Sequence, residues 1–354
     1  MNEDETDRYR LSERENQRIF REQIVRHELS GPRPQRRPTA VFLVGQPGAG
    51  KTALGSKVAE RLEERGGFVE VDSDLYKPYH PQYRELMARD DTLMARYTAA
   101  DGRAWMAQTQ QHVREHRLNA VIHETAQNPE YLAGQMDAYR RAGYRVEVAV
   151  MGVSEAASNQ GIVNRYHEQA RTGRGGRLTV QEKADLSYKG IPEMAQLIDD
   201  RRLAHQVEVY RRDETTPRYR NKLDEQRRWQ QPPRLRAAVE AERARPWNAK
   251  ERAGFTRTQA KLRREMGPGW KTRLDRIDRL ARPHLARTNG ADPRSAARLQ
   301  ARHLRIRRRT PAARTFQGRR LPVPIPRLPV ARQAGADQTR SNRPAAYRRA
   351  GPER

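Results

Sequence analysis

The sequence contains no cysteine, few aromatic side chains and no long apolar run. Aromatic residues occupy 6% and hydrophobic residues 35% of its 354 positions. The absence of cysteine excludes a disulfide scaffold, a cysteine-ligated zinc site and a thiol nucleophile. No apolar stretch approaches the roughly 20 residues that a membrane-spanning helix needs, and the polar, acid-rich start MNEDETDRYR is unlike a signal peptide. We therefore expect a soluble, cytoplasmic chain.

Charge is distributed unevenly along the chain. There are 71 Lys and Arg residues against 44 Asp and Glu residues, which gives a formal net charge of +27. Residues 1–214 carry 33 residues of each sign, so residues 215–354 supply the whole excess. The composition also changes at Glu214–Pro217, after which Arg, Ala and Pro dominate. This change predicts a globular module at 38–214, followed by an Arg/Pro-rich basic region at 215–354.

The first 37 residues have the pattern of a helical leader. Leu11, Ile19, Phe20 and Ile24 lie close to helical spacing, and Gly31 with the following proline ends the pattern. The leader is therefore predicted to end before the globular module begins.

Short apolar runs then alternate with longer amphipathic segments. The predicted strands are residues 40–44, 68–71, 120–123, 145–151 and 207–210. The predicted helices between them include residues 53–65, 105–117 and 129–141. Strands of four to seven residues that alternate with helices of about a dozen are typical of βαβ units. The module is therefore predicted to be an α/β fold, with a parallel sheet flanked by helices.

A phosphate-binding loop lies between the first predicted strand and the first long helix of the module. It fits the pattern G-x-x-x-x-G-K-[ST] without a departure: Gly45, Gln46, Pro47, Gly48, Ala49, Gly50, Lys51 and Thr52. Glycines let backbone N–H groups turn toward phosphate oxygens, and the start of the next helix favours the same anion. Lys51 is expected to contact the nucleotide phosphates, and the Thr52 hydroxyl to bind Mg²⁺. A glycine-rich loop without a ligand is the alternative.

Acidic residues follow the second and third predicted strands. The carboxyl end of a parallel strand is where ligands bind in open α/β sheets. A kinase that acts on a hydroxyl needs a carboxylate there, and Asp74, expected to lie nearer the phosphate loop than Asp72, is the candidate base. Asp72 is expected to cap the turn, and capping by both residues is the alternative. Glu124 is the candidate to hold Mg²⁺ or its waters, whereas His123 is expected to be structural.

Two arginines follow at the end of the predicted module. Arg165 lies in the segment NRYHEQ on a predicted helix, and Arg177 lies just before another helix, in GRLTVQEKAD. Arginines supplied in cis would stabilise the negative charge that spreads over a phosphoryl group during transfer. In a chain this rich in arginine, solvated surface side chains are the alternative.

Taken together, these motifs resemble a known family. GQPGAGKT, DSDLYKPYHPQY, VIHET, NRYHEQ, GRLTVQEKAD and VEVYRRD follow one another in the order and spacing of the zeta toxins, of the zeta/PezT type, in bacterial toxin–antitoxin systems. The resemblance covers roughly residues 9–213. It implies a P-loop kinase that uses ATP and Mg²⁺ to phosphorylate the 3′-hydroxyl of UDP-N-acetylglucosamine, and a cognate antitoxin as partner.

The resemblance assigns roles to single residues. Lys51 and Thr52 match the nucleotide-binding pair, and Asp74 matches the catalytic base. Arg165 and Arg177 match the phosphate-stabilising arginines. Glu124 matches the acid after the third strand and is expected, with Thr125, to contact the substrate as well as the metal.

The sequence departs from the family pattern where the acceptor would bind. The family's substrate-binding helix often carries an acid, but the predicted helix 105–117 has three glutamines and no acid before Glu115. Gln127 stands near a place where relatives often have arginine. Asp101, just before the helix, is the candidate substitute for the missing acid. The identity of the acceptor therefore stays open.

The basic region is predicted to be partly helical, at residues 235–245 and 249–266, and disordered over its last 60 or so residues. It could contact nucleic acid or another anion without sequence preference, or simply be solvated. We expect a chain that ends near Asp213 to fold and keep any kinase activity.

Three functional hypotheses follow. The first is a kinase of the zeta-toxin type. The second is a nucleic-acid-associated ATPase with a basic binding region. The third is a P-loop kinase with another acceptor, such as an antibiotic hydroxyl or a polynucleotide end. An aspartate beside the phosphate loop and the two arginines favour a kinase over an ATPase.

Overall fold

The structure is a computed structural model, and it describes residues 8–89, 94, 96–171 and 178–286. Residues up to Ala286 belong to one compact unit. Arg177 and residues 287–354 lie outside the described residues, so the expectations for them stay predictions.

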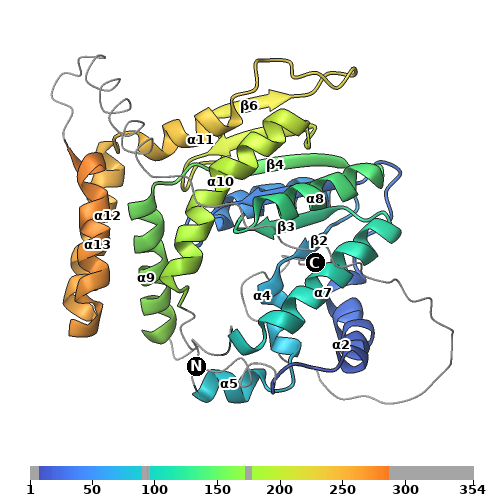
Figure 1. Cartoon of the computed structure of the whole chain (residues 1–354), viewed down its shortest axis with the longest axis horizontal. Coiled ribbons are helices and arrows are strands. Elements are labelled where there is room, and N and C mark those ends of the chain that lie inside the picture. The colour runs from blue at the N-terminus through green and yellow to red at the C-terminus, as the bar shows by residue number, and fades with distance from the viewer. Residues whose placement is uncertain (1–7, 90–93, 95, 172–177, 287–354) are drawn as a thin grey trace, which may run out of the picture. The chain divides into compact units, whose positions relative to one another are not determined.

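A six-stranded sheet lies at the centre of this unit, in the order β2-β3-β1-β4-β5-β6 (Figure 1). Its strands are β1 (Thr39–Val44), β2 (Val69–Val71), β3 (Ala120–Glu124), β4 (Arg145–Met151), β5 (Gln206–Tyr210) and β6 (Tyr219–Lys222). The first five pair in parallel, and β6 runs antiparallel to β5. All six residues of β1 are buried, as in parallel strands that are covered on both faces. The predicted α/β fold is confirmed, whereas the polar strand β6 was not predicted.

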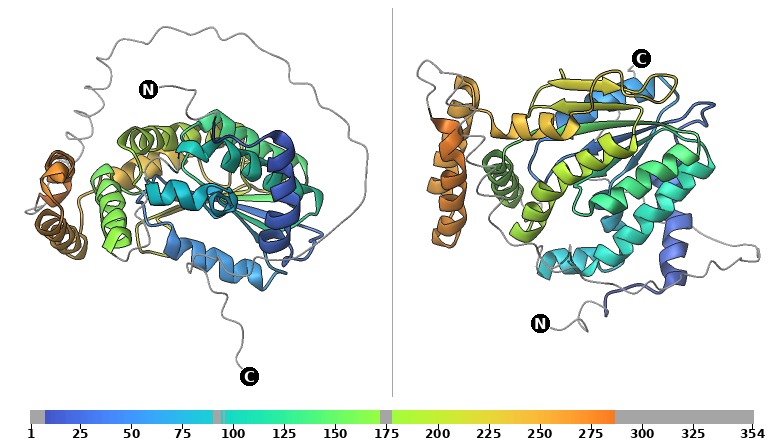
Figure 2. Two further views of the ribbon diagram at one scale, coloured as in Figure 1. Left: turned by 90° about the horizontal axis from the view of Figure 1, so that it is seen from below. Right: turned by 45° about the horizontal axis from the view of Figure 1, so that its top comes forward.

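Helices cover both faces of the sheet (Figure 2). On one face, Leu54, Val58 and Leu62 of α3 (Thr52–Glu63) pack against Val41 and Leu43 of β1. The opposite face of β1 is buried by the larger core cluster, to which several helices contribute, four of them long helices that follow the phosphate loop. These helices are α7 (Ala99–Glu115), α8 (Pro129–Arg141), α10 (Gln181–Arg201) and α11 (Leu235–Ala244).

Short helices follow β2, at the edge of the sheet. They are α4 (Ser73–Tyr76), the 3-10 turn η2 (Lys77–Tyr79) and α5 (Tyr83–Arg89). α4 and η2 contact α7, which carries Trp105, a fully buried side chain of the main core.

The N-terminal leader is helical, as predicted, and it contributes to the main core. α2 (Glu13–Ile19) continues into a π-helical segment, η1 (Phe20–Leu29). Ile19, Phe20 and Ile24 are buried in the same cluster as the sheet residues. The Trp105 indole N–H of α7 donates to the Asn16 carbonyl at 2.9 Å. The leader is therefore fixed against α7 rather than standing apart from the module.

The compact unit extends well beyond the boundary expected at residue 214. β6 extends the sheet, and Leu235 and Val239 of α11 are buried in the main core. The expected helices at 235–245 and 249–266 are present as α11 and α12 (Ala249–Glu265). They are followed by a 3-10 turn, η3 (Pro268–Trp270), and by α13 (Lys271–Leu285). The few apolar side chains of this segment recur at helical spacing, so a low apolar content still buries one face of each helix.

Helices α12 and α13 pack against α9 (Glu155–Arg171), as Figure 1 shows. Trp247, Phe255 and Leu262 form a buried cluster with Val163 of α9 and apolar residues of α13. The Gln160 amide of α9 donates to the Phe255 carbonyl at 2.9 Å. The segment 249–285 therefore stabilises the helix that carries Arg165.

Candidate active site

The phosphate loop connects β1 to α3 in the conformation that the motif predicts. Gly48 and Gly50 have φ of 75° and 82°, in the left-handed region that favours glycine. A Cβ atom at Gly48 would collide with the backbone oxygen of Ser158, so this position has no room for a side chain. The Gly45 N–H donates to the Glu124 carbonyl at 3.1 Å, which ties the start of the loop to the end of β3.

Lys51 lies where the loop meets the first turn of α3. Its Nζ donates to the Gly45 carbonyl at 2.7 Å. Burial lowers the pKa of Lys51, the carboxylates of Asp72 and Glu124 oppose this change, and the Arg165 charge adds to it. Lys51 is thus close enough to four of the charged groups that the sequence singles out to be influenced by them, namely Asp72, Asp74, Glu124 and Arg165.

The two aspartates after β2 have different environments. Asp72 precedes α4 as its N-cap, and its carboxylate accepts a 2.9 Å hydrogen bond from the Asp74 N–H. Burial and the neighbouring Asp74 charge raise the pKa of Asp72. The Asp74 carboxylate is 37% exposed and pairs with Lys77 Nζ at 2.8 Å. Asp72 therefore has the capping role that we expected.

The charges of Asp72 and Asp74 both influence the pKa of Lys51. Asp72 raises the pKa of Lys51 more strongly than Asp74 does. The strength of such an effect depends on burial as well as on distance, so the expectation that Asp74 lies nearer the phosphate loop stays a prediction. The Asp74 side chain is 37% exposed, so an incoming substrate can reach it.

Glu124 ends β3 beside the first residues of the phosphate loop, since it is in register with Val44. Burial raises the pKa of Glu124 to about 7, against the opposing effects of the Thr125 N–H hydrogen bond and of the Lys51 charge. A buried carboxylate of this kind is stabilised by an incoming cation.

The oxygen atoms near the loop suit a magnesium ion. Glu124 and the Thr52 hydroxyl are hard ligands, and no cluster of three or more His, Asp or Glu side chains suited to a metal occurs among the described residues. Mg²⁺ usually binds through one or two protein groups together with the phosphates of a nucleotide. The donor set therefore fits Mg²⁺ delivered with a nucleotide.

Arg165 projects from α9, and its guanidinium donates to the Thr179 hydroxyl at 3.3 Å. Arg273 of α13 donates to the carbonyl of the same threonine at 3.0 Å. Thr179 follows the undescribed residues 172–177, which include Arg177. The described contacts thus fix the chain just after Arg177, but the position of Arg177 itself stays a prediction.

Asp101 does not join this group of residues. Its carboxylate accepts hydrogen bonds from the Asn16 side chain at 2.9 Å and from the Leu11 N–H at 3.3 Å, and His80 Nε2 lies 3.5 Å away. Although burial opposes ionisation, these donors lower the pKa of Asp101. The carboxylate is engaged in anchoring the leader to α7, and its expected role in substrate binding stays a prediction.

Two further side chains near the site have local partners. Thr125 accepts a 3.0 Å hydrogen bond from the Gln127 side chain, so its role toward a substrate stays a prediction. His123 lies 3.1 Å from Glu70 on the neighbouring strand, in agreement with the structural role that we expected.

The zeta toxin family model matches residues 25–224, which is more than half of the chain. The chain belongs to the zeta toxin family. Toxin zeta of Streptococcus agalactiae is 27% identical over 177 residues, which cover 50% of this chain and 61% of that protein. Toxin PezT of Streptococcus pneumoniae serotype 4 is 23% identical over 190 residues, which cover 53% of this chain and 74% of that protein. The chain thus matches about three fifths of the S. agalactiae relative.

A solved structure from the PezAT chromosomal toxin–antitoxin system of S. pneumoniae shares the fold. It is 17% identical and covers 77% of this chain and 98% of its own, with a TM-score of 0.59. Within the described residues, no helix of this zeta toxin family member is long and apolar enough to cross a membrane.

Sequence reasoning missed two arginines that contact the phosphate loop. Arg212, just after β5, donates to the Gly48 carbonyl, and to the Ala157 carbonyl at 3.2 Å. Arg243 of α11 donates to the Gln46 side chain at 3.1 Å. Arg212 is the second arginine of the motif VEVYRRD, which pointed to the family but not to this contact. Arg243 lies beyond the zeta toxin match, in a segment where arginine is too common to stand out.

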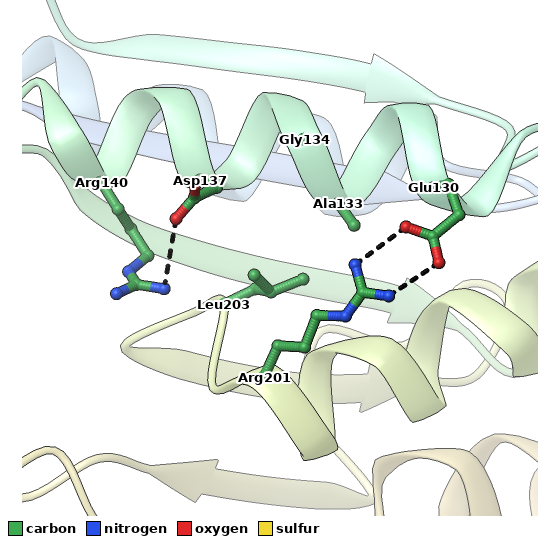
Figure 3. Close-up of a pocket in the computed structure, with 7 residues that line it drawn as sticks. All are labelled: Glu130, Ala133, Gly134, Asp137, Arg140, Arg201 and Leu203. Carbon is green, nitrogen blue, oxygen red and sulfur yellow. Dashed lines mark hydrogen bonds and ion pairs between the residues drawn. The ribbon is translucent and has the colours of Figure 1, made fainter. Parts of the chain in front are cut away.

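A separate cavity of about 270 Å³ lies between α8 and the end of α10 (Figure 3). It is lined by Glu130, Ala133, Gly134, Asp137, Arg140, Arg201 and Leu203. Arg201 pairs with Glu130 at 2.8 Å, and Arg140 lies 3.7 Å from Asp137. None of the residues assigned to the phosphate loop or its acids lines this cavity, and its charged side chains pair with one another.

Proposed function

We propose that this protein transfers the γ-phosphoryl group of ATP to the sugar hydroxyl of UDP-N-acetylglucosamine, or of a similar small acceptor, and thereby acts as a bacterial toxin. The observation that carries the proposal is the set of charges around Lys51. Asp72, Glu124 and Arg165 all influence this lysine, which lies at the phosphate loop between β1 and α3. A P-loop kinase needs cationic groups for the phosphates together with nearby carboxylates.

Each residue has a distinct task in this reaction. Backbone N–H groups of the loop and the Lys51 ammonium bind the phosphates. Asp74 accepts the proton of the acceptor hydroxyl, whose oxygen forms the new bond to the γ-phosphorus as the bond to ADP breaks. Arg165 and Arg177 stabilise the charge on the transferring group. Thr52 and Glu124 would hold Mg²⁺, which would supply positive charge next to the phosphates.

Lys77 influences how Asp74 can act as a base. Its ammonium pairs with the Asp74 carboxylate in the structure without substrate. An adjacent cation keeps a carboxylate ionised and therefore able to accept a proton. The acceptor hydroxyl has to approach the Asp74 carboxylate beside Lys77 or displace Lys77.

The acceptor is proposed from the family resemblance, and the structure adds a constraint. Gln108 of α7 donates to the Asn16 side-chain oxygen of the leader at 2.8 Å, and Asp101 is also bound to Asn16. The Asp101 carboxylate is engaged with the leader, and Gln108 carries an amide in place of a carboxylate. Recognition of the acceptor would therefore rely on other groups, such as Glu124 and Thr125.

ADP release with a panel of acceptors tests the function, with UDP-N-acetylglucosamine first and the Lys51→Ala variant as control. A kinase consumes ATP much faster when its acceptor is present and yields a phosphorylated acceptor. ATP hydrolysis that needs no acceptor and is stimulated by DNA or RNA would instead support the ATPase alternative. Phosphorylation of an antibiotic hydroxyl or a polynucleotide end in the same panel would support the third hypothesis, a P-loop kinase with another acceptor.

Two partners are proposed on weaker grounds. A cognate antitoxin is expected because the solved relative comes from a toxin–antitoxin system. The basic region is expected to retain polyanions at low salt. Co-expression with the product of a neighbouring small gene, and polyanion retention at two salt concentrations, test these partners.

A further inference from the structure

Helix α11 contacts the phosphate loop through one buried arginine. Arg243 is 5% exposed. Its guanidinium donates to the Gln46 side-chain oxygen at 3.1 Å and to the Tyr188 carbonyl of α10 at 2.7 Å. It also lies over the Tyr188 ring, 4.1 Å from the ring centroid. The planar guanidinium thus joins α10, α11 and the second residue of the loop at one point.

Gln46 transmits this contact to the backbone that binds phosphate. Its side chain is buried, with Nε2 donating to the Val153 carbonyl at 2.7 Å while Oε1 accepts from Arg243. The Gln46 carbonyl accepts the Ala49 N–H at 3.0 Å. The preceding carbonyl, of Gly45, accepts the Lys51 ammonium. The two hydrogen bonds of the Gln46 side-chain amide hold this residue in place. They therefore also position the backbone carbonyls of Gly45 and Gln46, which accept hydrogen bonds from Lys51 and Ala49.

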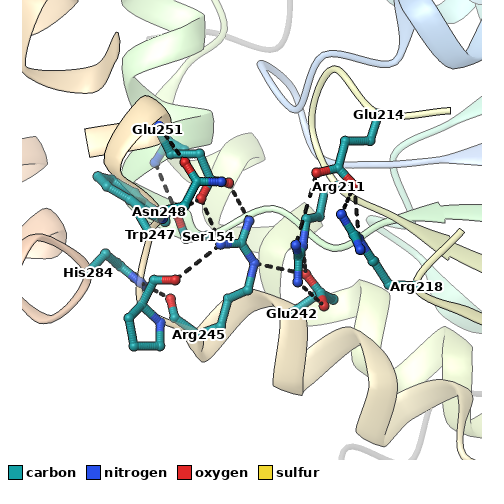
Figure 4. Close-up of polar contacts among 12 residues, drawn as sticks. Ser154, Arg211, Glu214, Arg218, Glu242, Arg245, Trp247, Asn248, Glu251 and His284 are labelled. Carbon is teal, nitrogen blue, oxygen red and sulfur yellow. Dashed lines mark hydrogen bonds and ion pairs between the residues drawn. The ribbon is translucent and has the colours of Figure 1, made fainter. Parts of the chain in front are cut away.

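A second route joins α11 to the loop, and Figure 4 shows its first part, the contacts of Glu242 with Arg211 and Arg245. Glu242, next to Arg243, accepts two hydrogen bonds from Arg211, at 2.6 and 3.0 Å, and one from Arg245 at 2.9 Å. Arg211 immediately precedes Arg212, which donates to the Gly48 carbonyl. A Cβ atom at Gly152 would come within 2.7 Å of Glu242 Cβ, so α11 packs closely on the segment that supplies the Val153 carbonyl.

We propose that Arg243 is a positioning residue for the phosphate loop, and that α11 is consequently required for tight nucleotide binding. This inference rests on the proposed function, since it concerns the same nucleotide site. Arg243 acts through Gln46 and touches neither nucleotide nor acceptor. Its effect should therefore appear in nucleotide affinity and loop dynamics rather than in the proton transfer at Asp74.

The test compares Arg243→Met, Arg243→Lys, Gln46→Met and the Arg243→Met/Gln46→Met double variant. Arg114→Met is the matched control, because Arg114 also lies over a tyrosine ring, 5.2 Å from the Tyr139 centroid, with a buried guanidinium nitrogen. Two quantities are measured on the full chain. They are the dissociation constant of Mg²⁺–ADP by calorimetry and the hydrogen-exchange protection of amides 45–52 without nucleotide.

Arg243→Met should weaken ADP binding by about tenfold or more, since a buried hydrogen bond to a charged group is lost. It should also increase exchange in the loop, whereas Arg114→Met changes neither quantity. The ADP affinity and the loop exchange of Arg243→Lys should be intermediate between those of Arg243→Met and the parent protein. The double variant should be no weaker than Gln46→Met alone, because the two residues act through one contact.

The outcomes separate this inference from the proposed function. Unchanged ADP affinity and loop exchange in a folded Arg243→Met protein would overturn the inference while leaving the kinase proposal intact. Failure of the parent protein to bind ADP would refute the proposed function, and the exchange comparison would still decide whether Arg243 orders the loop. Should Arg243→Met fail to fold, Gln46→Met breaks the same contact from the loop side, and normal affinity in that variant would equally overturn the inference.

Discussion

Asp199 on α10 is expected to make the stability of the protein depend on pH. Its Oδ2 accepts the Leu235 N–H at 2.8 Å and the Arg236 N–H at 3.4 Å, so it caps the start of α11. Its Oδ1 is buried and has no hydrogen-bond partner among the described residues. Burial raises the pKa of Asp199 from 3.8 to about 6, although these two N–H groups oppose the change.

The sign of the effect follows from these two pKa values. Well below pH 3.8 the carboxyl is protonated in both the folded and the unfolded chain and contributes no difference. As the pH rises toward 6, the unfolded chain loses its proton first, so the free energy of unfolding falls. The difference between 3.8 and about 6 corresponds to about 3 kcal/mol, which is fully lost at pH 7.

Asp199→Asn removes the titration and keeps an oxygen for the two N–H groups. Urea unfolding of variant and parent between pH 4 and pH 7 measures the effect. The stability of the variant relative to the parent should increase by up to about 3 kcal/mol over this range. Asp200→Asn is the control, because Asp200 is exposed and its carboxylate accepts a hydrogen bond from the half-buried Gln196 side chain. A relative stability that is constant with pH, or that decreases as the pH rises, would refute the reasoning.

Three further predictions concern the site and the extent of the fold. Lys51→Ala should abolish ADP binding with little change in melting temperature, and normal binding would argue against the nucleotide site. Asp74→Asn should slow phosphoryl transfer by a factor of about 10²–10⁴ and leave ADP affinity unchanged. If Asp74→Asn slows transfer only slightly and Asp72→Asn slows it strongly, Asp72 is the base instead of Asp74. Ending the chain at residue 213 should give unfolded protein, contrary to the expectation from composition, since losing buried Leu235 and Val239 alone costs about 3–6 kcal/mol. A chain that ends at residue 286 should keep ADP binding and phosphoryl transfer. Circular dichroism shows which of the two shortened chains is folded, and the transfer assay shows which is active.

The local motifs were predictable from sequence because their physics is local. The phosphate-loop pattern fixes glycines at Gly45 and Gly50, and the strand before the loop is a continuous apolar run. The cap at Asp72 likewise depends only on its neighbours in the chain. These features therefore appear in the structure at or within a residue or two of their predicted positions.

Features that depend on distant parts of the chain were not predictable in this way. Asp101 looked available for a substrate, but its partner Asn16 lies 85 residues away in the leader. Arg243 reaches Gln46 across 197 residues, and nothing in its own surroundings distinguishes it from other arginines. The low apolar content after residue 214 concealed a folded segment, because each of its helices buries one narrow face.

Transfer of labelled phosphate from [γ-³²P]ATP to UDP-N-acetylglucosamine tests the central claim most directly. The full chain with Mg²⁺ should give a labelled sugar nucleotide, and Lys51→Ala should give none. If the label appears on an acceptor of another kind, the protein is a kinase whose substrate differs from the one proposed. Label that appears only as inorganic phosphate, at the same rate with every acceptor and without one, would contradict the claim that this protein is a kinase.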